Sequence, residues 1–301
     1  MSPPDLAIIV ASQGTPEETA RCLDSLLQQD GVTANQLEII LAEGPPHAAI
    51  SSLSSRFAGK PVRFVRCQGR SLPQLHGGGT VESTAPLVAL SEGHCTFARN
   101  WAVSAVAAHA SCEDSAIGGS VVPGSDLGTI NTGLFFCDYA QFLPPFTAAQ
   151  TCDLPGNNVI FKRDCLAISP ELDQQGFWKT FYCKQLYADG KTMHNQPDIT
   201  VYYNRRLSID QIAIRRYNHG RCFGGMRANK ISVFKRAAYC LTGPILPILL
   251  TTRLWERGWS KHQYRKELLS SSAASFLCIC LWAAGEWVGN LFGAGESCSS
   301  L

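Results

Sequence analysis

The 301-residue sequence lacks a strong net charge, closely paired cysteines and a basic leader, and each absence narrows the class of protein. Lysine and arginine exceed aspartate and glutamate by only two residues, so no basic field points to a nucleic acid partner. The thirteen cysteines are scattered and form no CxxC pair, and the opening MSPPDLAIIVASQG has no positive stretch before its short apolar run. We therefore expect reduced, mostly buried thiols in a cytosolic compartment and no export signal.

Apolar strands alternate with helical segments in the first half of the chain. Short apolar runs predict strands at 6–11, 37–43, 62–65 and 86–91. Between the first two, Thr15, Pro16 and Glu18 form the N-cap, first position and capping box of a helix. This alternation predicts an α/β fold, with a doubly wound, mostly parallel sheet flanked by helices.

The second half is less regular, but several elements can be predicted. Strands are expected at 117–125, within 154–166 and at 197–206, and a helix at 177–190. Ser208, followed three residues later by Gln211, predicts the start of another helix. No internal repeat or low-complexity linker occurs before residue 230.

Polar residues follow two of the buried strands. Glu43 comes after the second strand, and Glu92 and His94 come after the fourth. Ligands of open parallel sheets bind at the carboxyl ends of the strands, so we expect these residues to face one crevice. The Glu-x-His turn can be read as an ordinary solvated loop or as two ligands for a divalent metal that carries a phosphate.

The C-terminal quarter changes character near residue 230. Residues 240–252 and 270–293 are apolar, and the latter stretch is long enough to cross a bilayer. The segment between them, 253–267, is basic and aromatic, as expected next to anionic lipid on the cytoplasmic side. We predict a domain at 1–230 and a membrane-associated segment at 231–301; a buried hairpin of a soluble domain is the alternative.

The order of these pieces resembles a known family. LAIIVASQG, LEIILAEG, LVALSEGHCTFARNW, LPGNNVIFKRDCL and QIAIRRYNHGRCFGGMR follow one another over residues 6–230. They are similar to the opening strands, the DxD turn, the acceptor-side segment and the Gln/Arg-rich motif of inverting glycosyltransferases of family 2. The resemblance implies a GT-A fold and transfer of a sugar from a nucleotide-diphosphate donor, with inversion.

The resemblance also implies roles for individual residues. Glu92 and His94 match the first and third positions of the DxD motif and would bind a divalent metal, Mn or Mg. Glu43 would contact the base or ribose of the donor. The remaining matches are Arg215, Arg216 and Arg221 at the donor diphosphate, and Asn157, Asn158 and Trp178 on the acceptor side.

The sequence departs from the family where the catalytic base is expected. That carboxylate position, in Gly-Phe-Trp-Lys, is held by Lys179. A protonated lysine cannot accept the proton of an acceptor hydroxyl. Asp173 and Glu171 lie just upstream and are the nearest substitutes, so we expect slow or absent transfer.

We interpret the chain as a membrane-associated glycosyltransferase with its catalytic domain in the cytoplasm and a glycan or lipid-linked acceptor. The first alternative is a degenerate homologue that binds a nucleotide sugar without turnover, which the lysine at 179 favours. The second is a nucleotidyltransferase, but ASQGTPEETA after the first strand contains no lysine or arginine for a phosphate loop.

Overall fold

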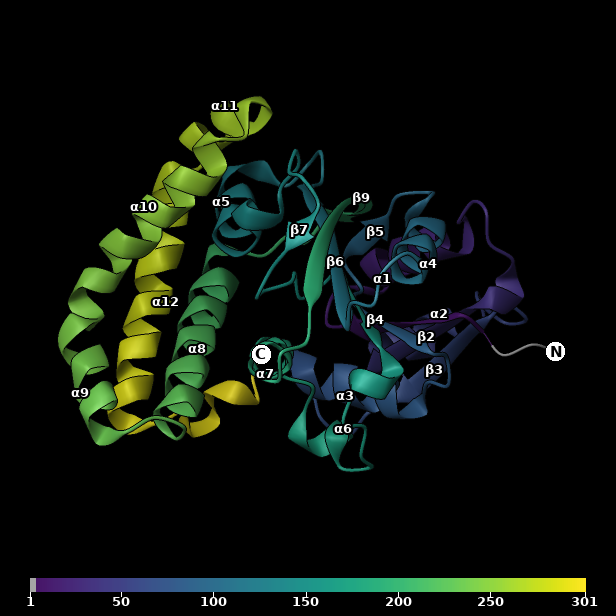
Figure 1. Ribbon diagram of the computed structural model, residues 1–301, viewed down its shortest axis with the longest axis horizontal. Coiled ribbons are helices and arrows are strands. Elements are labelled where there is room, and N and C mark those ends of the chain that lie inside the picture. The colour runs from purple at the N-terminus through teal and green to yellow at the C-terminus, as the bar shows by residue number, and fades with distance from the viewer. Residues whose placement is uncertain (1–3) are drawn as a thin grey trace. The chain divides into compact units, whose positions relative to one another are not determined.

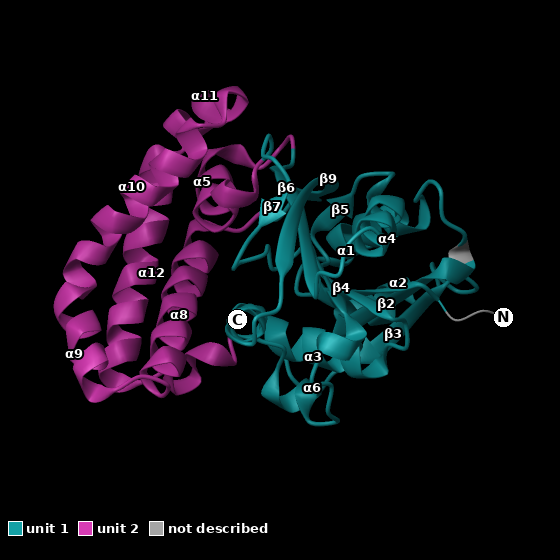
Figure 2. Cartoon of the chain, in the orientation of Figure 1, with its two compact units in different colours: residues 1–124, 144–205 teal, residues 125–143, 206–301 magenta. Residues whose placement is uncertain are grey.

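The chain forms two compact units, and each is described by itself. The computed structural model describes residues 4–301. One unit comprises residues 1–124 and 144–205 and contains the β-sheet, so we call it the sheet unit. The other comprises 125–143 and 206–301, and we call it the helical unit (Figure 2).

The first four strands form a parallel array, as predicted. They are β1 (Leu6–Ser12), β2 (Leu37–Glu43), β3 (Val62–Arg66) and β4 (Leu87–Glu92). Their order in the sheet is β3-β2-β1-β4, and every neighbouring pair is parallel. All seven residues of β1 are buried, which explains its unbroken apolar sequence: helices cover both faces of the sheet.

The second half of the chain extends the same sheet with mixed strands. They are β5 (Cys95–Phe97), β6 (Ala116–Pro123), β7 (Ala149–Gln150), β8 (Val159–Lys162) and β9 (Met193–Tyr203). β8 runs antiparallel to both β4 and β6, and β6 is parallel to β9. The carboxyl ends of β4, β6 and β9 and the amino end of β8 therefore meet at one edge.

Helices flank this sheet on both sides (Figure 1). They are α1 (Pro16–Leu27), α2 (Ala48–Leu53), α3 (Leu72–Glu82), α4 (Trp101–Ala110), α6 (Leu172–Gln175) and α7 (Lys179–Ala188). The capping box predicted for Thr15 and Glu18 is present at the start of α1. A core of strand residues such as Ile9 and Phe161 packs against Leu172, Phe177 and other residues of the α6–α7 region. The predicted α/β class, with a mostly parallel sheet between helices, is confirmed.

The helical unit is built around two long helices in close contact. Its helices are α5 (Gly128–Tyr139), α8 (Ile209–Ala228), α9 (Val233–Thr242), α10 (Leu246–Trp259), α11 (Arg265–Ser270) and α12 (Ser272–Phe292). A Cβ atom on Gly220 of α8 would collide with the carbonyl of Trp282, and one on Gly285 of α12 with the carbonyl of Tyr217. Glycines on both helices thus let the two backbones approach each other.

Two features of the helical unit differ from the sequence expectations. The unit includes α5 and α8 as well as the C-terminal helices, whereas we expected a boundary at residue 230. The sequence did not reveal the glycine contacts that join α8 to α12. Cys222 and Cys298 form a disulfide. The expectation of reduced thiols is therefore wrong for this pair, since the C-terminal segment folds back onto α8.

The helical unit also contains two stretches that are long and apolar enough to cross a membrane. They are Val233–Trp259 and Ser272–Phe292. In the most apolar 18 residues of each stretch, 6% of the first and 44% of the second are buried inside the protein. The basic segment at 253–267 begins inside α10. Its first arginines are therefore held on a helix surface.

Candidate active site

The carboxyl ends of β1, β2 and β4 lie side by side and carry the acidic residues selected from the sequence. Ser12 at the end of β1 pairs with Glu43 of β2, and Ala11 pairs with Glu92 of β4. Glu43 and Glu92 are two strands apart, which corresponds to about 10 Å between their backbones. Both residues therefore lie at one edge of the sheet, as their positions in the sequence predicted.

Glu92 and His94 are brought together in a tight, buried turn. His94 Nδ1 lies 3.7 Å from Glu92 Oε2, and both side chains are almost fully buried. The intervening Gly93 donates its N–H to the carbonyl of Ala11, and a Cβ atom at this position would lie 3.0 Å from Thr19 Oγ1. The imidazole packs edge-on against Tyr203, with 4.7 Å between ring centroids. Burial of both side chains argues against an ordinary solvated loop.

Arg205 completes this cluster, although we did not select it from the sequence. Its Nη1 lies 3.7 Å from the same Glu92 Oε2, and its side chain is buried. Arg205 follows β9, whose carboxyl end lies at the same edge of the sheet as that of β4. The rule used for Glu43 and Glu92, that residues after a parallel strand face the ligand, would have found it.

The cluster suits a metal ion only in part. Carboxylate and imidazole are accepted ligands of Mn²⁺, but no group of three His, Cys, Asp or Glu side chains that could hold a metal occurs within residues 4–301. The guanidinium of Arg205 also offsets the charge of Glu92. These residues therefore fit a metal that is shared with a diphosphate, whose oxygens would add ligands and negative charge, but not a metal held by the protein alone.

Glu43 is buried and engaged by its own chain. Its Oε1 accepts the N–H of Ala49 at 2.9 Å, and its Oε2 accepts the N–H of Ile50 at 2.8 Å. Both carboxylate oxygens thus hold the first turn of α2. Glu43 is therefore not a solvent-exposed carboxylate, and both of its oxygens are already engaged by backbone N–H groups rather than open to a nucleoside.

The two asparagines before β8 have different environments, although both are fully buried. Asn158 accepts the indole N–H of Trp101 and donates to the carbonyls of Ser120 and Ile199, so it ties strands and α4 together. Asn157 donates to Cys95 Sγ at 3.4 Å, and its Oδ1 has no hydrogen-bond partner in the described chain. Asn157 thus lies beside the Glu92–His94 turn and retains an acceptor atom.

Lys179 is the first residue of α7 and forms an ion pair. Its Nζ lies 2.8 Å from Oδ1 of Asp153, and it also donates to the carbonyl of Leu154. The lysine side chain passes Gly156, next to Asn157. Trp178, just before it, donates its indole N–H to the carbonyl of Gln175. Asp153 is thus a carboxylate near the expected base position that we did not select from the sequence.

Asp173 and Glu171, the substitutes proposed from the sequence, contact a different part of the sheet unit. Asp173 lies on α6, and its side chain packs near Gly78 of α3 and Cys67, which follows β3. Burial and then the charge of Asp173 raise the pKa of the Cys67 thiol to about 11. Glu171 is exposed at the start of α6. No contact of either carboxylate with Lys179 occurs in the described chain.

The arginines expected at the diphosphate belong to the helical unit. Arg216 is buried and donates to Asp138 on α5 at 2.5 Å and to the carbonyl of Cys278 at 3.3 Å. Arg221 donates to the carbonyl of Gly293 at 3.4 Å, and Arg215 is half-buried on the same helix. Their donor role remains a prediction.

The fold was compared with those of known proteins. No family model and no curated protein matches the sequence. The structure is similar to that of the mannosyltransferase PcManGT from Pyrobaculum calidifontis in complex with GDP-Man and Mn²⁺, at 16% sequence identity. The match covers 97% of this chain and 88% of that chain, with a TM-score of 0.58. The chain shares this glycosyltransferase fold.

A second solved structure, S. aureus TarS 1–349 in complex with UDP, matches at 11% identity and a TM-score of 0.49. The match covers 94% of this chain and 90% of the TarS chain.

Proposed function

We propose that the chain is a membrane-associated glycosyltransferase of family 2, with a GT-A fold. It transfers a sugar with inversion from a nucleotide-diphosphate donor to a glycan or a lipid-linked acceptor. The observation that carries this proposal is the buried cluster of Glu92, His94 and Arg205 at the carboxyl edge of the sheet. The fold shared with a mannosyltransferase supports it.

The donor diphosphate would bind at this cluster. Negative charge develops on the diphosphate as the bond to the sugar breaks, and a cation placed there stabilises the transition state. The guanidinium of Arg205 can supply such charge directly. Glu92 and His94 would hold a divalent metal, Mn or Mg, which when bound adds further neutralising charge. The Mn²⁺ in the PcManGT structure supports this assignment.

The nucleoside would lie toward β2. Glu43 acts there by fixing the residues between β2 and α2, because both of its oxygens hold the first turn of that helix. Asn157 Oδ1, beside Cys95, is the acceptor that could meet a sugar hydroxyl or a bound water.

Asp153 is the carboxylate that we propose as the base. An inverting transfer needs a group that takes the proton of the acceptor hydroxyl as the new bond forms. Lys179 holds Asp153 at 2.8 Å and so acts as a positioning residue. Asp173 and Glu171, which contact other residues, are the competing candidates.

The ion pair of Lys179 and Asp153 also favours one alternative function. If the ammonium group of Lys179 prevents the carboxylate of Asp153 from taking the proton of the acceptor hydroxyl, the chain binds nucleotide sugars without turnover. This degenerate homologue would retain the donor cluster and lose transfer.

The helical unit would attach the protein to the membrane with the sheet unit in the cytoplasm. The small buried share of Val233–Trp259 supports this, since apolar side chains there face outward.

Turnover by the full-length protein with a panel of UDP- and GDP-sugars, with and without Mn²⁺, tests the proposal. Transfer or donor hydrolysis should depend on Asp153: Asp153→Asn should lower it about 100-fold, as expected for loss of a general base, with donor binding unchanged. Asp173→Asn and Glu171→Gln are the matched controls and should be near wild type. Activity that appears only in Lys179→Glu would instead identify the degenerate homologue.

A further inference from the structure

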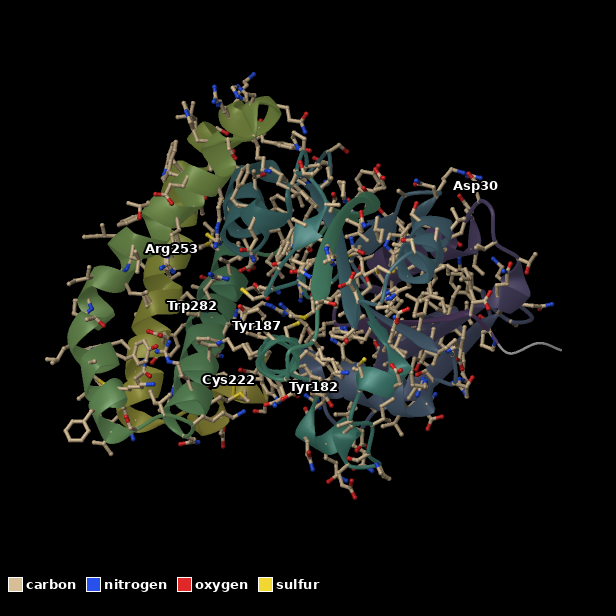
Figure 3. All side chains as sticks on the ribbon, in the orientation of Figure 1. Asp30, Tyr182, Tyr187, Cys222, Arg253 and Trp282 are labelled. Atoms are coloured by element: carbon tan, nitrogen blue, oxygen red, sulfur yellow. A yellow bond between two sulfur atoms is a disulfide. The ribbon has the colours of Figure 1, made fainter. Side chains whose placement is uncertain are left out.

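The helical unit contains a cavity of about 260 Å³ between α5, α8, α10 and α12. Three guanidinium groups line it, those of Arg216 on α8 and of Arg253 and Arg257 on α10, together with Trp282 on α12 and the carboxylate of Asp138. Figure 3 labels Arg253 and Trp282 on their helices. We call this site the basic cavity. It is separate from the Glu92 cluster, which belongs to the sheet unit.

The basic cavity carries an excess of positive charge. Arg216 is neutralised by Asp138 at 2.5 Å. Burial disfavours the charged form of Arg216, but the charge of Asp138 outweighs it and holds the pKa of Arg216 above its usual value. The side chains of Arg253 and Arg257 have no ion pair or hydrogen bond with any residue of the described chain. Two formal positive charges are therefore available to a ligand.

The surface that leads to these arginines is apolar. Leu241, Ile245, Leu249, Arg253 and Arg257 are spaced four residues apart along Val233–Trp259, so each lies next to the following one on a ridge that winds slowly around this helical stretch. The first three are exposed, Leu241 at 81% and Ile245 at 61%. Along this line the surface changes from apolar to cationic within one helical turn, about 6 Å. Leu250 and Trp282 continue the apolar surface into the cavity wall.

We propose that the basic cavity binds the phosphate headgroup of an anionic lipid, with its acyl chains along the exposed side of α9 and α10. A guanidinium pair recognises phosphate oxygens through charge-assisted hydrogen bonds. The apolar line next to the arginines favours an amphiphile over free phosphate. This inference rests on the proposed membrane association but not on sugar transfer, and basic cavities between membrane helices are known to hold lipid headgroups.

The test uses the full chain in neutral detergent. Short-chain phosphatidic acid is added below its critical micelle concentration, and its binding is measured by calorimetry. We expect saturable binding that weakens at least about tenfold in Arg253→Gln/Arg257→Gln, because the variant loses the charge-assisted hydrogen bonds of both guanidinium groups to the phosphate. Lys60→Gln/Lys191→Gln removes the same charge from exposed positions of the sheet unit and should bind as wild type. Equal melting temperatures of both variants establish that each is folded.

Two further probes separate the possible ligands. Inorganic phosphate that binds as tightly as phosphatidic acid would overturn the lipid assignment and leave a free-phosphate site. Short-chain phosphatidylcholine that binds equally well would show that apolar contact suffices, which also overturns the proposal. An unchanged affinity in the arginine variant would remove the basic cavity as the site. Because no sugar donor is present, these outcomes are independent of transferase activity.

Discussion

At the scale of single residues, the buried cluster of Glu92, His94 and Arg205 combines two side chains of metal-ligand type with an arginine. The arginine and the imidazole contact the same carboxylate oxygen. Glu92 Oε2 lies 3.7 Å from both His94 Nδ1 and Arg205 Nη1. Glu92 would serve as a ligand of a divalent metal when one is bound, and the guanidinium of Arg205 would then be available to the diphosphate. The balance between these two cations can be tested by removing each partner of Glu92.

Glu92→Ala and His94→Ala should each abolish the stimulation of nucleotide diphosphate binding by Mn²⁺. Loss of a ligand should weaken Mn²⁺-dependent binding about ten- to a hundredfold, equivalent to about 1.4–3 kcal/mol. Glu92→Ala should retain metal-independent binding, since Arg205 is then released from its carboxylate. Calorimetry with UDP and GDP, with and without Mn²⁺, measures both effects.

Glu113→Gln is the control for that experiment, because Glu113 is exposed just before β6, at the opposite edge of the sheet. Binding that needs no metal and is unchanged by Glu92→Ala and His94→Ala would return the turn to an ordinary loop.

A second residue near the cluster makes the stability of the sheet unit sensitive to acid. His76 on α3 is fully buried, and its Nε2 contacts the carbonyl of Ser91 at 2.9 Å. Burial lowers the pKa of His76 to about 4 from an ordinary value of 6.5. Between these values the unfolded chain binds a proton that the folded chain excludes, so stability should fall as the pH drops from 6.5 to 4, by roughly 3 kcal/mol at most.

Urea unfolding at several pH values across this window measures the effect. His76→Gln keeps a donor for Ser91 without a titrating group, so its stability should change less with pH than that of the wild type. An identical pH slope in both proteins would contradict the assignment of this sensitivity to His76. His109, whose burial also lowers its pKa to about 4, should contribute to the remaining slope.

At the scale of elements, the contact of α8 with α12 depends on the absence of side chains at the crossing. Gly220→Ala should destabilise the helical unit by more than about 2 kcal/mol, which is a typical cost of inserting an extra group into a packed core. This cost exceeds the better helix propensity of alanine. The added Cβ would meet the carbonyl of Trp282, and backbone cannot move aside easily. Thermal unfolding of the full chain measures the change.

Gly258→Ala in α10 is the matched control for this prediction. Its added Cβ would meet the end of the Leu268 side chain at 2.9 Å, which can rotate away. The control should be near neutral, because the helix propensity of alanine offsets the small adjustment. Equal stabilities of the two variants would contradict close packing of α8 on α12.

At the scale of the whole molecule, the prediction concerns the membrane. Leu241→Glu/Ile248→Glu should move the full-length protein from the membrane fraction to the soluble fraction. Both side chains are exposed, at 81% and 64%, and a charge in the hydrocarbon region costs about 2.5–3.5 kcal/mol. Fractionation of cell extracts measures the distribution. These substitutions leave the α8–α12 contact in place, whereas deletion of 236–301 would remove α12.

Tyr187→Glu provides the comparison, because Tyr187 on α7, labelled in Figure 3, is also 64% exposed but belongs to the sheet unit. This variant should stay with the membrane. A wild-type protein that is already soluble would contradict membrane association and favour a soluble helical unit.

Local sequence patterns are sufficient to predict the first half of the sheet. Unbroken apolar runs bounded by capping residues specify buried parallel strands and helix starts through local interactions. The strands β1, β2, β3 and β4 follow the predicted limits closely, and α1 begins where predicted. The same pattern identified which residues stand after strands, and hence Glu43, Glu92 and His94. These predictions needed only periodicity and the rule that ligands meet the carboxyl ends of parallel strands.

Which of these residues share an environment depends on the tertiary structure. Arg205 reaches Glu92 across 113 positions because β9 ends at the same edge of the sheet as β4, and Asp153 meets Lys179 because the start of α7 packs beside the loop before β8. The hydrogen bonds of Asn158, the Cys222–Cys298 disulfide and the basic cavity likewise join distant segments. Such contacts depend on strand order and helix packing, which local periodicity does not encode.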